Sequence, residues 1–300
     1  QSALRIRKIG TDLISLAGGQ FIHPIKTVIG GVTSGIPRQK ADEMIKTIEE
    51  LLPITAELVD TYWQMSLEMG DRIGSWGDDE PTYYLASTEA NNFRLNSNRL
   101  RLMCPEGREC QNFSPHEFGS YLQIEDSDYS YAGISSFQGE IMRANSLARI
   151  NLASSMGTPK ADAYLQRFVE TFGRPAHAIM FFDLCRGIEL VYALEKARQM
   201  LECDLEHGET EVGYTPRDGV GYGLVEAPRG PLLHHYEVEN GLIKNADFII
   251  PTVHNMLAIR RALMVVAKRY VSVDGINSEL GRAVGRVVRA FDPCIACATK

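Results

Sequence analysis

Two cysteines near the end of the printed sequence, Cys294 and Cys297, are the first residues whose spacing could support chemistry. Two residues separate the thiols, so both sulfur atoms can face one point, which suits nickel, zinc or iron. One such pair supplies only half of a four-sulfur site, and the other four cysteines are not spaced as a second pair. A bound metal, a redox pair and two inert buried thiols all stay open on spacing alone. Because chain ends usually fray, a functional pair here requires a tail that is buried against other residues.

A second candidate is the segment EAPRG, from Glu226 to Gly230. Pro228 and Gly230 flank Arg229 and restrict the local backbone, so we expect a stiff turn to aim the guanidinium group. A guanidinium held in this way can donate hydrogen bonds to an anionic ligand. The alternative is a structural arginine that binds a carboxylate or loop carbonyl groups, and this is the more common role.

The composition describes a globular chain with an ordinary hydrophobic core. The 300 residues are 44% hydrophobic and 23% charged. No apolar run reaches the roughly 18–20 residues that cross a bilayer, so we expect no transmembrane segment. The formal net charge of −7 and the scattered basic residues argue against a nucleic-acid partner. Six cysteines are too few for a disulfide-rich secreted domain, so we expect mostly reduced thiols and a cytoplasmic protein.

Helical periodicity dominates the elements that must position these residues. Apolar spacing predicts helices at about 3–17, 40–69, 158–173, 177–202, 254–270 and 275–290. Pro53 would bend the second helix or divide it. Turn residues and short alternating runs predict a β-rich insertion at about 75–135, and residues 220–253 indicate a strand, a turn and a strand. We interpret residues 1–300 as a single domain that is mainly α with a small β insertion (α+β).

Several longer segments resemble the large, catalytic subunit of nickel-iron hydrogenases, in particular its cytoplasmic branch, which passes electrons to cofactors or to heterodisulfide reductase. They are HPIKTVIGGV (23–32), SLARINLASSMGTPKA (146–161), GVGYGLVEAPRGPLLHHYE (219–237), IIPTVHN (249–255) and DPCIACAT (292–299). The family's C-terminal signature is DPCxxCxxH, and few other families combine it with EAPRG. The similarity extends from about residue 3 to residue 300. It implies the C-terminal two thirds of a large subunit, with the long-helix bundle of that family.

The resemblance implies a metal site and a reaction for the cysteine pair. Cys294 would be a terminal nickel ligand and a candidate proton acceptor, and Cys297 would bridge nickel and iron. The iron would carry CO and cyanide ligands, and the implied reaction is the reversible heterolytic cleavage of H2. Electrons would pass to iron–sulfur clusters of a hydrogenase small subunit, then to an acceptor module of the NAD, F420 or heterodisulfide reductase type.

The same resemblance implies roles for the residues around the pair. Arg229 would lie over the vacant coordination position and near an iron-bound cyanide. Pro228, Pro251 and Thr252 would form the rest of that pocket, and Asp292 would pair with the arginine. Arg229, Asp292 and Cys294 are thus the implied catalytic residues.

Departures from the family pattern define an alternative. The family's other cysteine pair, in RxCGxC, is absent, so an N-terminal segment or a separate chain would have to supply it. Lys300 stands at the place of a terminal histidine that binds magnesium; a protonated ammonium supplies positive charge there but cannot coordinate the ion. FDLCRGIE (182–189) and ANSLAR (144–149) also differ from the usual residues. The alternative is a hydrogenase-like scaffold subunit of an electron-transfer complex without an active metal centre.

Overall fold

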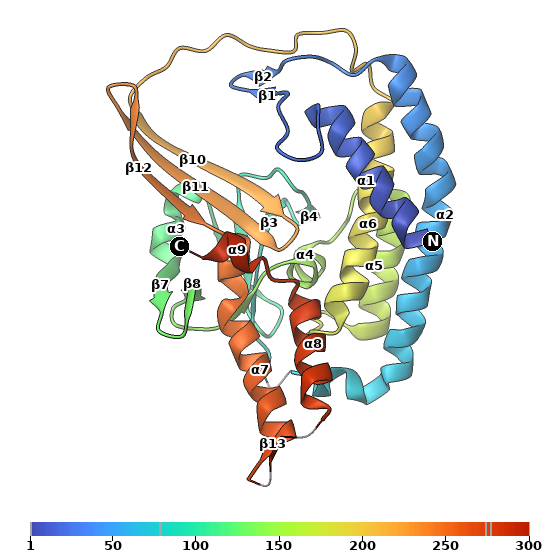
Figure 1. Cartoon of the computed structure of the whole chain (residues 1–300), viewed down its shortest axis with the longest axis vertical. Helices are drawn as coiled ribbons and strands as arrows, with labels where there is room; N and C mark the ends of the chain where they lie inside the picture. Colours follow the sequence, from blue (N-terminus) through green and yellow to red (C-terminus); the bar gives the residue numbers. More distant parts are fainter. Residues whose placement is uncertain (1, 78–79, 274, 277, 300) are drawn as a thin grey trace. The chain divides into compact units, whose positions relative to one another are not determined.

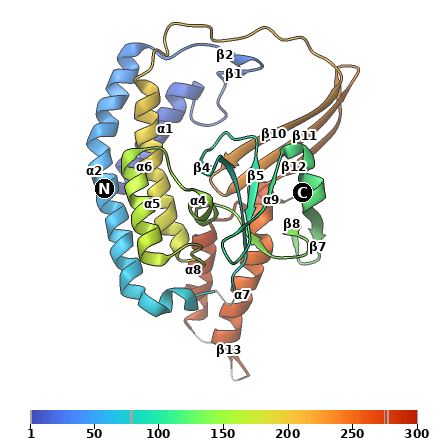
Figure 2. The same ribbon diagram turned by 180° about the vertical axis from the view of Figure 1, so that it is seen from behind.

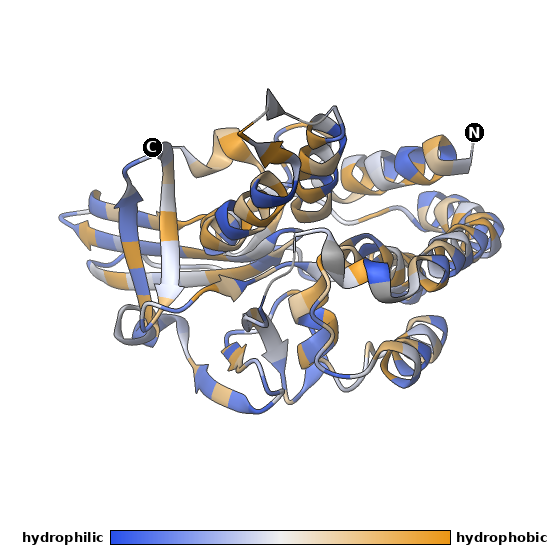
Figure 3. Ribbon diagram, turned by 90° about the horizontal axis from the view of Figure 1, so that it is seen from below, coloured by the Kyte–Doolittle hydropathy of each residue, from blue (hydrophilic) through white to orange (hydrophobic). Residues whose placement is uncertain are grey.

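The computed structural model describes residues 2–77, 80–273, 275–276 and 278–299. The chain divides into two compact units, one formed by residues 1–61 with 187–217 and the other by residues 62–186 with 218–300. Figure 1 labels the elements of both. Polar residues interrupt the apolar ones along the helices (Figure 3), and no helix within the described ranges has both the length and the hydropathy needed to cross a bilayer.

The first unit is mainly helical. It contains α1 (Ser2–Gly18), the first part of α2 (Arg38–Met69), the later part of α6 (Phe181–Leu201) and an antiparallel pair, β1 (Thr27–Val28) with β2 (Gly31–Val32). α2 continues through Pro53, so this residue does not divide the helix. A Cβ atom at Gly187 would lie 3.1 Å from a Val59 methyl carbon, so α6 and α2 approach closely at this glycine.

The second unit combines helices with small sheets, which Figure 2 shows from behind. Its separate helices and 3₁₀ turns are η1 (Gly70–Ser75), η2 (Pro115–Glu117), α3 (Phe118–Tyr121), α4 (Ser146–Leu152), α5 (Pro159–Phe172), η3 (Pro251–Asn255), α7 (Met256–Tyr270), α8 (Leu280–Phe291) and α9 (Ile295–Ala298). Its strands are β3 (Tyr83–Glu89), β4 (Asn92–Phe93), β5 (Leu100–Met103), β6 (Glu109–Phe113), β7 (Leu122–Ser127), β8 (Ser130–Phe137), β9 (Met142–Arg143), β10 (Gly219–Ala227), β11 (Gly230–Glu239), β12 (Leu242–Ile249), β13 (Val271–Ser272) and β14 (Gly275–Ile276).

The antiparallel sheet β10–β11–β12 carries the EAPRG segment. The sequence suggested two strands here, but the structure has three, because Asn240 and Gly241 make a second tight turn. Both residues have positive φ angles, 54° and 72°, as a two-residue type I′ turn requires. Asn-Gly is the usual sequence signal for this turn, so the third strand was encoded locally and missed.

A second sheet has the strand order β4–β3–β5–β6, and β9 pairs parallel to β3. Its core shares buried side chains with the first sheet: Leu85, Leu100 and Phe113 belong to the same cluster as Leu233 of β11 and Ile249 of β12. The burial of these apolar side chains holds β11 and β12 in place. The ends of β10, β11 and β12 therefore have a fixed position within the second unit.

Candidate metal centre

Arg229 lies in the loop of the β10–β11 hairpin. Ala227 pairs with Gly230, so Pro228 and Arg229 form a two-residue connection. Gly230 has a φ angle of 131°, and a Cβ atom there would lie 2.6 Å from the Cβ of Ala144. Only glycine tolerates both the backbone angle and this close approach. The loop therefore has little freedom to move the arginine.

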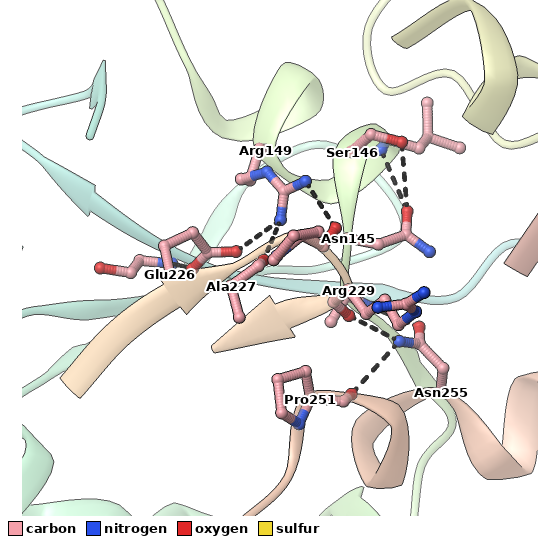
Figure 4. A network of polar contacts seen from close by, with 12 residues as sticks. Asn145, Ser146, Arg149, Glu226, Ala227, Arg229, Pro251 and Asn255 are labelled. Atoms are coloured by element: carbon pink, nitrogen blue, oxygen red, sulfur yellow. Dashed lines mark hydrogen bonds and ion pairs between the residues drawn. The ribbon is translucent and has the colours of Figure 1, made fainter. Parts of the chain in front are cut away.

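A buried ion pair supports the same loop (Figure 4). Arg149 Nη1 lies 2.8 Å from Glu226 Oε1, and the two side chains are only 2% and 0% exposed. The Arg149 guanidinium also donates to the carbonyl oxygens of Ala227 and Pro228, at 3.0 and 2.9 Å. Because these partners replace the lost hydration, the two charges are satisfied in the interior. They fix the backbone immediately before the loop arginine.

Asn255 connects the loop to the turn η3. Its Nδ2 atom donates to the carbonyl oxygens of Arg229 and Pro251 at 3.0 and 3.4 Å (Figure 4). Its Oδ1 atom accepts from the backbone amide of Ala144 at 2.8 Å. One buried side chain thus joins three segments that are far apart in the sequence.

The Arg229 side chain is paired with Asp292. Nη2 of Arg229 lies 2.9 Å from Oδ2 of Asp292, and Nε donates to the Asp292 carbonyl oxygen. Asp292 ends α8 in the left-handed conformation, with φ 49° and ψ 51°, and so turns the chain toward the cysteines. The side chains are 34% and 50% exposed, so solvent screens the attraction. The pair orients the guanidinium more than it stabilises the fold.

The C-terminal tail is attached at three points. The Cys294 amide donates to Thr252 Oγ1 at 3.1 Å, Ala298 is 3% exposed, and Thr299 forms an antiparallel bridge with Ala132 of β8. Cys294 is half-buried, whereas Cys297 is exposed. The tail is therefore anchored, but the expected burial of the cysteine pair is only partial among the described residues.

Cys294 and Cys297 form a disulfide, and their Cα atoms are 5.3 Å apart. The short helix α9 begins directly after Cys294 and brings the second sulfur back to the first. Both sulfur atoms thus reach one point. Metal binding requires the reduced pair, because the thiolate is the ligand.

One cavity of about 450 Å³ collects most of the residues singled out from the sequence. Its lining includes Pro228, Arg229, Pro251, Thr252, Cys294 and Cys297. Asp292 is not among the lining residues and reaches the cavity through its contact with Arg229. Leu232, Phe248 and Ile250 make much of the remaining wall apolar.

The donor atoms of this cavity fit half of a nickel-iron site. Two sulfur atoms, a fixed cation and a hydroxyl group on an apolar wall suit a soft metal that carries anionic ligands. Within the described ranges, no cluster of three or more Cys, His, Asp or Glu residues could hold a metal ion. Further donors are therefore needed to complete the site. Lys300, at the expected magnesium position, lies outside the described residues.

Three histidines near the cavity have different surroundings. His234 and His235 are successive residues of β11 and so point to opposite faces of the sheet. Nδ1 of His234 lies 2.8 Å from Tyr236 Oη, and Nδ1 of His235 lies 3.0 Å from Asp247 Oδ2. His254 is fully buried, with Nδ1 3.3 Å from Ser135 Oγ. Burial lowers the pKa of His254 to about 4, so its imidazole is neutral at neutral pH.

The positioning roles of Arg149 and Asn255 were not recognised from the sequence. A usable signal existed for Arg149, because it stands among the apolar residues Leu147, Ala148 and Ile150, and a charge in such a segment requires a carboxylate partner if the segment is buried. Glu226, in the segment already singled out, is that partner. No comparable signal marks Asn255, since its partners are backbone groups.

Comparisons with known proteins identify the family of this chain. The sequence profile of the nickel-dependent hydrogenase family matches residues 96–300. The vhc F420-non-reducing hydrogenase chain of Methanococcus voltae is 29% identical over 317 residues, which cover 100% of this chain and 65% of that protein. The corresponding vhu chain of the same organism is 32% identical over 276 residues, covering 89% of this chain and 65% of that protein. The chain thus spans slightly less than two thirds of the length of these relatives.

A solved structure shares the fold. The NAD+-reducing [NiFe]-hydrogenase in its H2-reduced state superimposes with a TM-score of 0.93 at 26% identity, over 100% of this chain and 68% of that chain. This similarity confirms the fold class predicted from the sequence. Because the family profile matches more than half of its residues, this chain belongs to the nickel-dependent hydrogenase family.

Proposed function

We propose that this chain is part of the catalytic subunit of a nickel-iron hydrogenase, which cleaves H2 heterolytically and reversibly. One observation carries the proposal: the sulfur atoms of Cys294 and Cys297 share a cavity with the guanidinium of Arg229. Family membership supports the choice of metal and reaction.

The two cysteines would hold the metals after reduction of their disulfide. Cys294 would be the terminal nickel ligand, and Cys297 would bridge nickel and iron. When bound, the nickel-iron centre, with CO and cyanide on its iron, supplies the site at which H2 is polarised. The sulfur of Cys294 would then accept the proton released from H2. An N-terminal segment or a separate chain would provide the second cysteine pair.

The other cavity residues supply fixed electrostatics. Arg229 keeps a positive charge at the wall, where it would stabilise negative charge on the bound ligands, with Asp292 maintaining its orientation. Thr252 Oγ1 accepts a hydrogen bond from the Cys294 amide, so its own hydroxyl hydrogen remains available for donation. Pro228 and Pro251 present apolar surface that would exclude water beside the diatomic ligands.

The electrons released would leave through other subunits. We propose that the direct partner is an iron–sulfur small subunit, with a cofactor-linked acceptor module beyond it, since the similar proteins include F420-non-reducing and NAD+-reducing hydrogenases. A cytoplasmic location is proposed from the sparse cysteines and from the branch of the family that the sequence resembles. Residues 1–300 would act within one large-subunit domain.

A second candidate is a scaffold subunit that has lost its metal. The observation that favours it is the incomplete donor set, because the cavity of the described chain offers two sulfur atoms and these are joined to each other.

Metal analysis of the complete protein complex separates the two functions. The proposed enzyme should contain nickel and iron and show infrared bands of CO and cyanide, whereas a scaffold should lack all of them.

Cys294→Ser should remove most of the nickel and the H2 uptake without unfolding the protein, because a hydroxyl group is a poor ligand for a soft metal. Cys203→Ser, which changes an exposed cysteine, is the matched control. Unchanged nickel content in Cys294→Ser would refute the assignment.

A further inference from the structure

Helices α7 and α8 are strongly basic in a chain whose formal net charge is −7. They pack against each other in the second unit (Figure 1) and contain no Asp or Glu. Their seven basic residues are Arg260, Arg261, Lys268, Arg269, Arg282, Arg286 and Arg289. Such a concentration of one charge sign creates a positive potential over this surface.

A groove of about 320 Å³ lies along α7. Ile141, Leu257, Met264 and Val265 form its apolar lining, and Arg260, Arg261 and Lys268 form its charged lining. On α7 these residues recur at three- and four-residue spacing, so they make one stripe along the helix. Met264 is 52% exposed, so an apolar side chain in the lining remains in solvent.

Much of the positive charge in this groove is not neutralised by carboxylates. Arg261 forms an ion pair with Glu80. Arg260 instead stacks on Tyr129, with its guanidinium carbon 4.5 Å from the ring centroid, and keeps its charge. Lys268 is exposed and has no acidic partner in the part of the chain that the structure describes. The groove thus offers an apolar strip with cations beside it.

This combination fits a protein segment better than a nucleic acid. Helix-binding grooves bury apolar side chains at helical spacing, and exposed methionine adapts to varied partners. A phosphate backbone would meet the exposed carboxylates Glu125, Asp126 and Asp128, on the β7–β8 hairpin that also provides Tyr129. The same carboxylates repel an acidic partner at the Arg260 end of the groove. The acidic residues of the partner would therefore lie at the other end, toward Lys268.

We propose that the α7 groove binds an amphipathic, acidic helix of a partner protein. The apolar side of that helix would cover Met264, and its carboxylates would face Lys268. The groove shares no residue with the cysteine cavity, so this assignment does not depend on the hydrogenase function.

A labelled synthetic peptide tests the groove directly in the complete complex. A peptide of about 20 residues, with Leu and Glu arranged on opposite faces of a helix, should bind and should weaken as salt increases. Lys268→Glu should reduce its affinity by about tenfold, because an attraction becomes a repulsion. Met264→Asp should abolish binding, whereas Lys46→Glu, on the exposed face of α2, should leave it unchanged. A scrambled peptide of equal composition should bind far more weakly.

Other outcomes would overturn the assignment. Equal binding of the scrambled peptide, equal loss in Lys46→Glu, or binding of only a single-stranded oligonucleotide or phosphatidylserine vesicles would each do so. If another protein of the complex covers the groove, the labelled peptide cannot enter. A photo-crosslinking amino acid at Met264 in the purified complex should then link to an acidic, amphipathic helix of that protein. A link to a basic or non-helical segment, or to a second copy of this chain, would reject the proposal.

Discussion

At the scale of single residues, Asn255 illustrates how the site depends on groups outside the cavity lining. Its amide donates to two carbonyl oxygens and accepts from one amide, so each of its polar atoms is used. An aspartate of the same shape would turn the donor into an acceptor facing those carbonyl oxygens. The position of the Arg229 backbone therefore depends in part on a side chain that does not line the cavity.

His254 predicts a pH dependence of stability at this scale. Its folded pKa is about 4, against about 6.5 for an unperturbed histidine. The unfolded chain therefore binds the proton first as pH falls. The contribution of the neutral His254 imidazole to the free energy of unfolding should be fully present above about pH 6.5. It should be lost progressively as the pH falls to about 4, by an amount on the order of 3 kcal/mol.

Denaturant unfolding at several pH values measures this effect. His254→Gln should make the free energy of unfolding depend less on pH between about pH 6.5 and 4. His207→Gln, which changes an exposed histidine, should not. The same slope in His254→Gln and in the unmodified protein would show that the buried imidazole is not the cause.

At the scale of elements, the β10–β11 loop is held by elements from other parts of the second unit. α4 provides Arg149, η3 provides Asn255, and the residue before α4, Asn145, accepts from the Leu147 amide and so caps the helix. A hairpin alone would leave its loop mobile, because two strands provide few buried contacts. The packing of these elements turns a hairpin loop into a rigid wall of the cavity.

Neutralising one partner of the buried charge pair should destabilise this assembly strongly. Glu226→Gln leaves Arg149 charged and buried without its carboxylate, which typically costs about 3–5 kcal/mol. The denaturant midpoint of unfolding should fall accordingly.

Two further variants control for this change. Glu239→Gln, in the same sheet but exposed and paired with Lys244, should alter stability by less than about 0.5 kcal/mol. Replacement of both buried charges, as in Arg149→Met with Glu226→Leu, should recover part of the loss. Equal midpoints for Glu226→Gln and Glu239→Gln would contradict the importance of the pair.

At the scale of the whole molecule, the connection between α6 and β10 is an open segment. It contains no helix or longer strand, and every residue from 206 to 218 is exposed. Thr210 and Val212 exchange backbone hydrogen bonds with Val32 and Gly30, whereas Arg217 lies in the exposed stretch that follows them. Exposed stretches outside helices and sheets are preferred sites of proteolysis. Arg217 is the one Lys or Arg between α6 and β10.

Brief trypsin digestion should therefore cut early after Arg217. Mass spectrometry of the fragments identifies the position, and Arg217→Gln should remove this cut. Early cleavage inside α2 or α5 instead would show that the helices open before the connection does.

Much of the fold could be predicted from the sequence because its signals are local. The helices α1, α5 and α7 follow from apolar spacing, and Pro159 at the first helical position marks the start of α5. Thr158, the first residue of the predicted range, directly precedes the helix, and its hydroxyl group makes no capping bond. The third strand of the β10–β12 sheet was missed although the turn at Asn240 and Gly241 signals it, so that error came from interpretation.

The sequence by itself determined the spacing of Cys294 and Cys297, the stiff path around Arg229 and the similarity to a hydrogenase family. The tertiary structure alone decided contacts that neither the spacing nor the resemblance implied: Arg149 reaches Glu226 across 77 residues, the Cys294 amide reaches Thr252 across 42, and Asn255 reaches Ala144 across 111. Spacing along a chain governs only neighbours within a turn or a strand. Contacts between distant residues depend on how buried apolar surfaces pack, which no local pattern specifies.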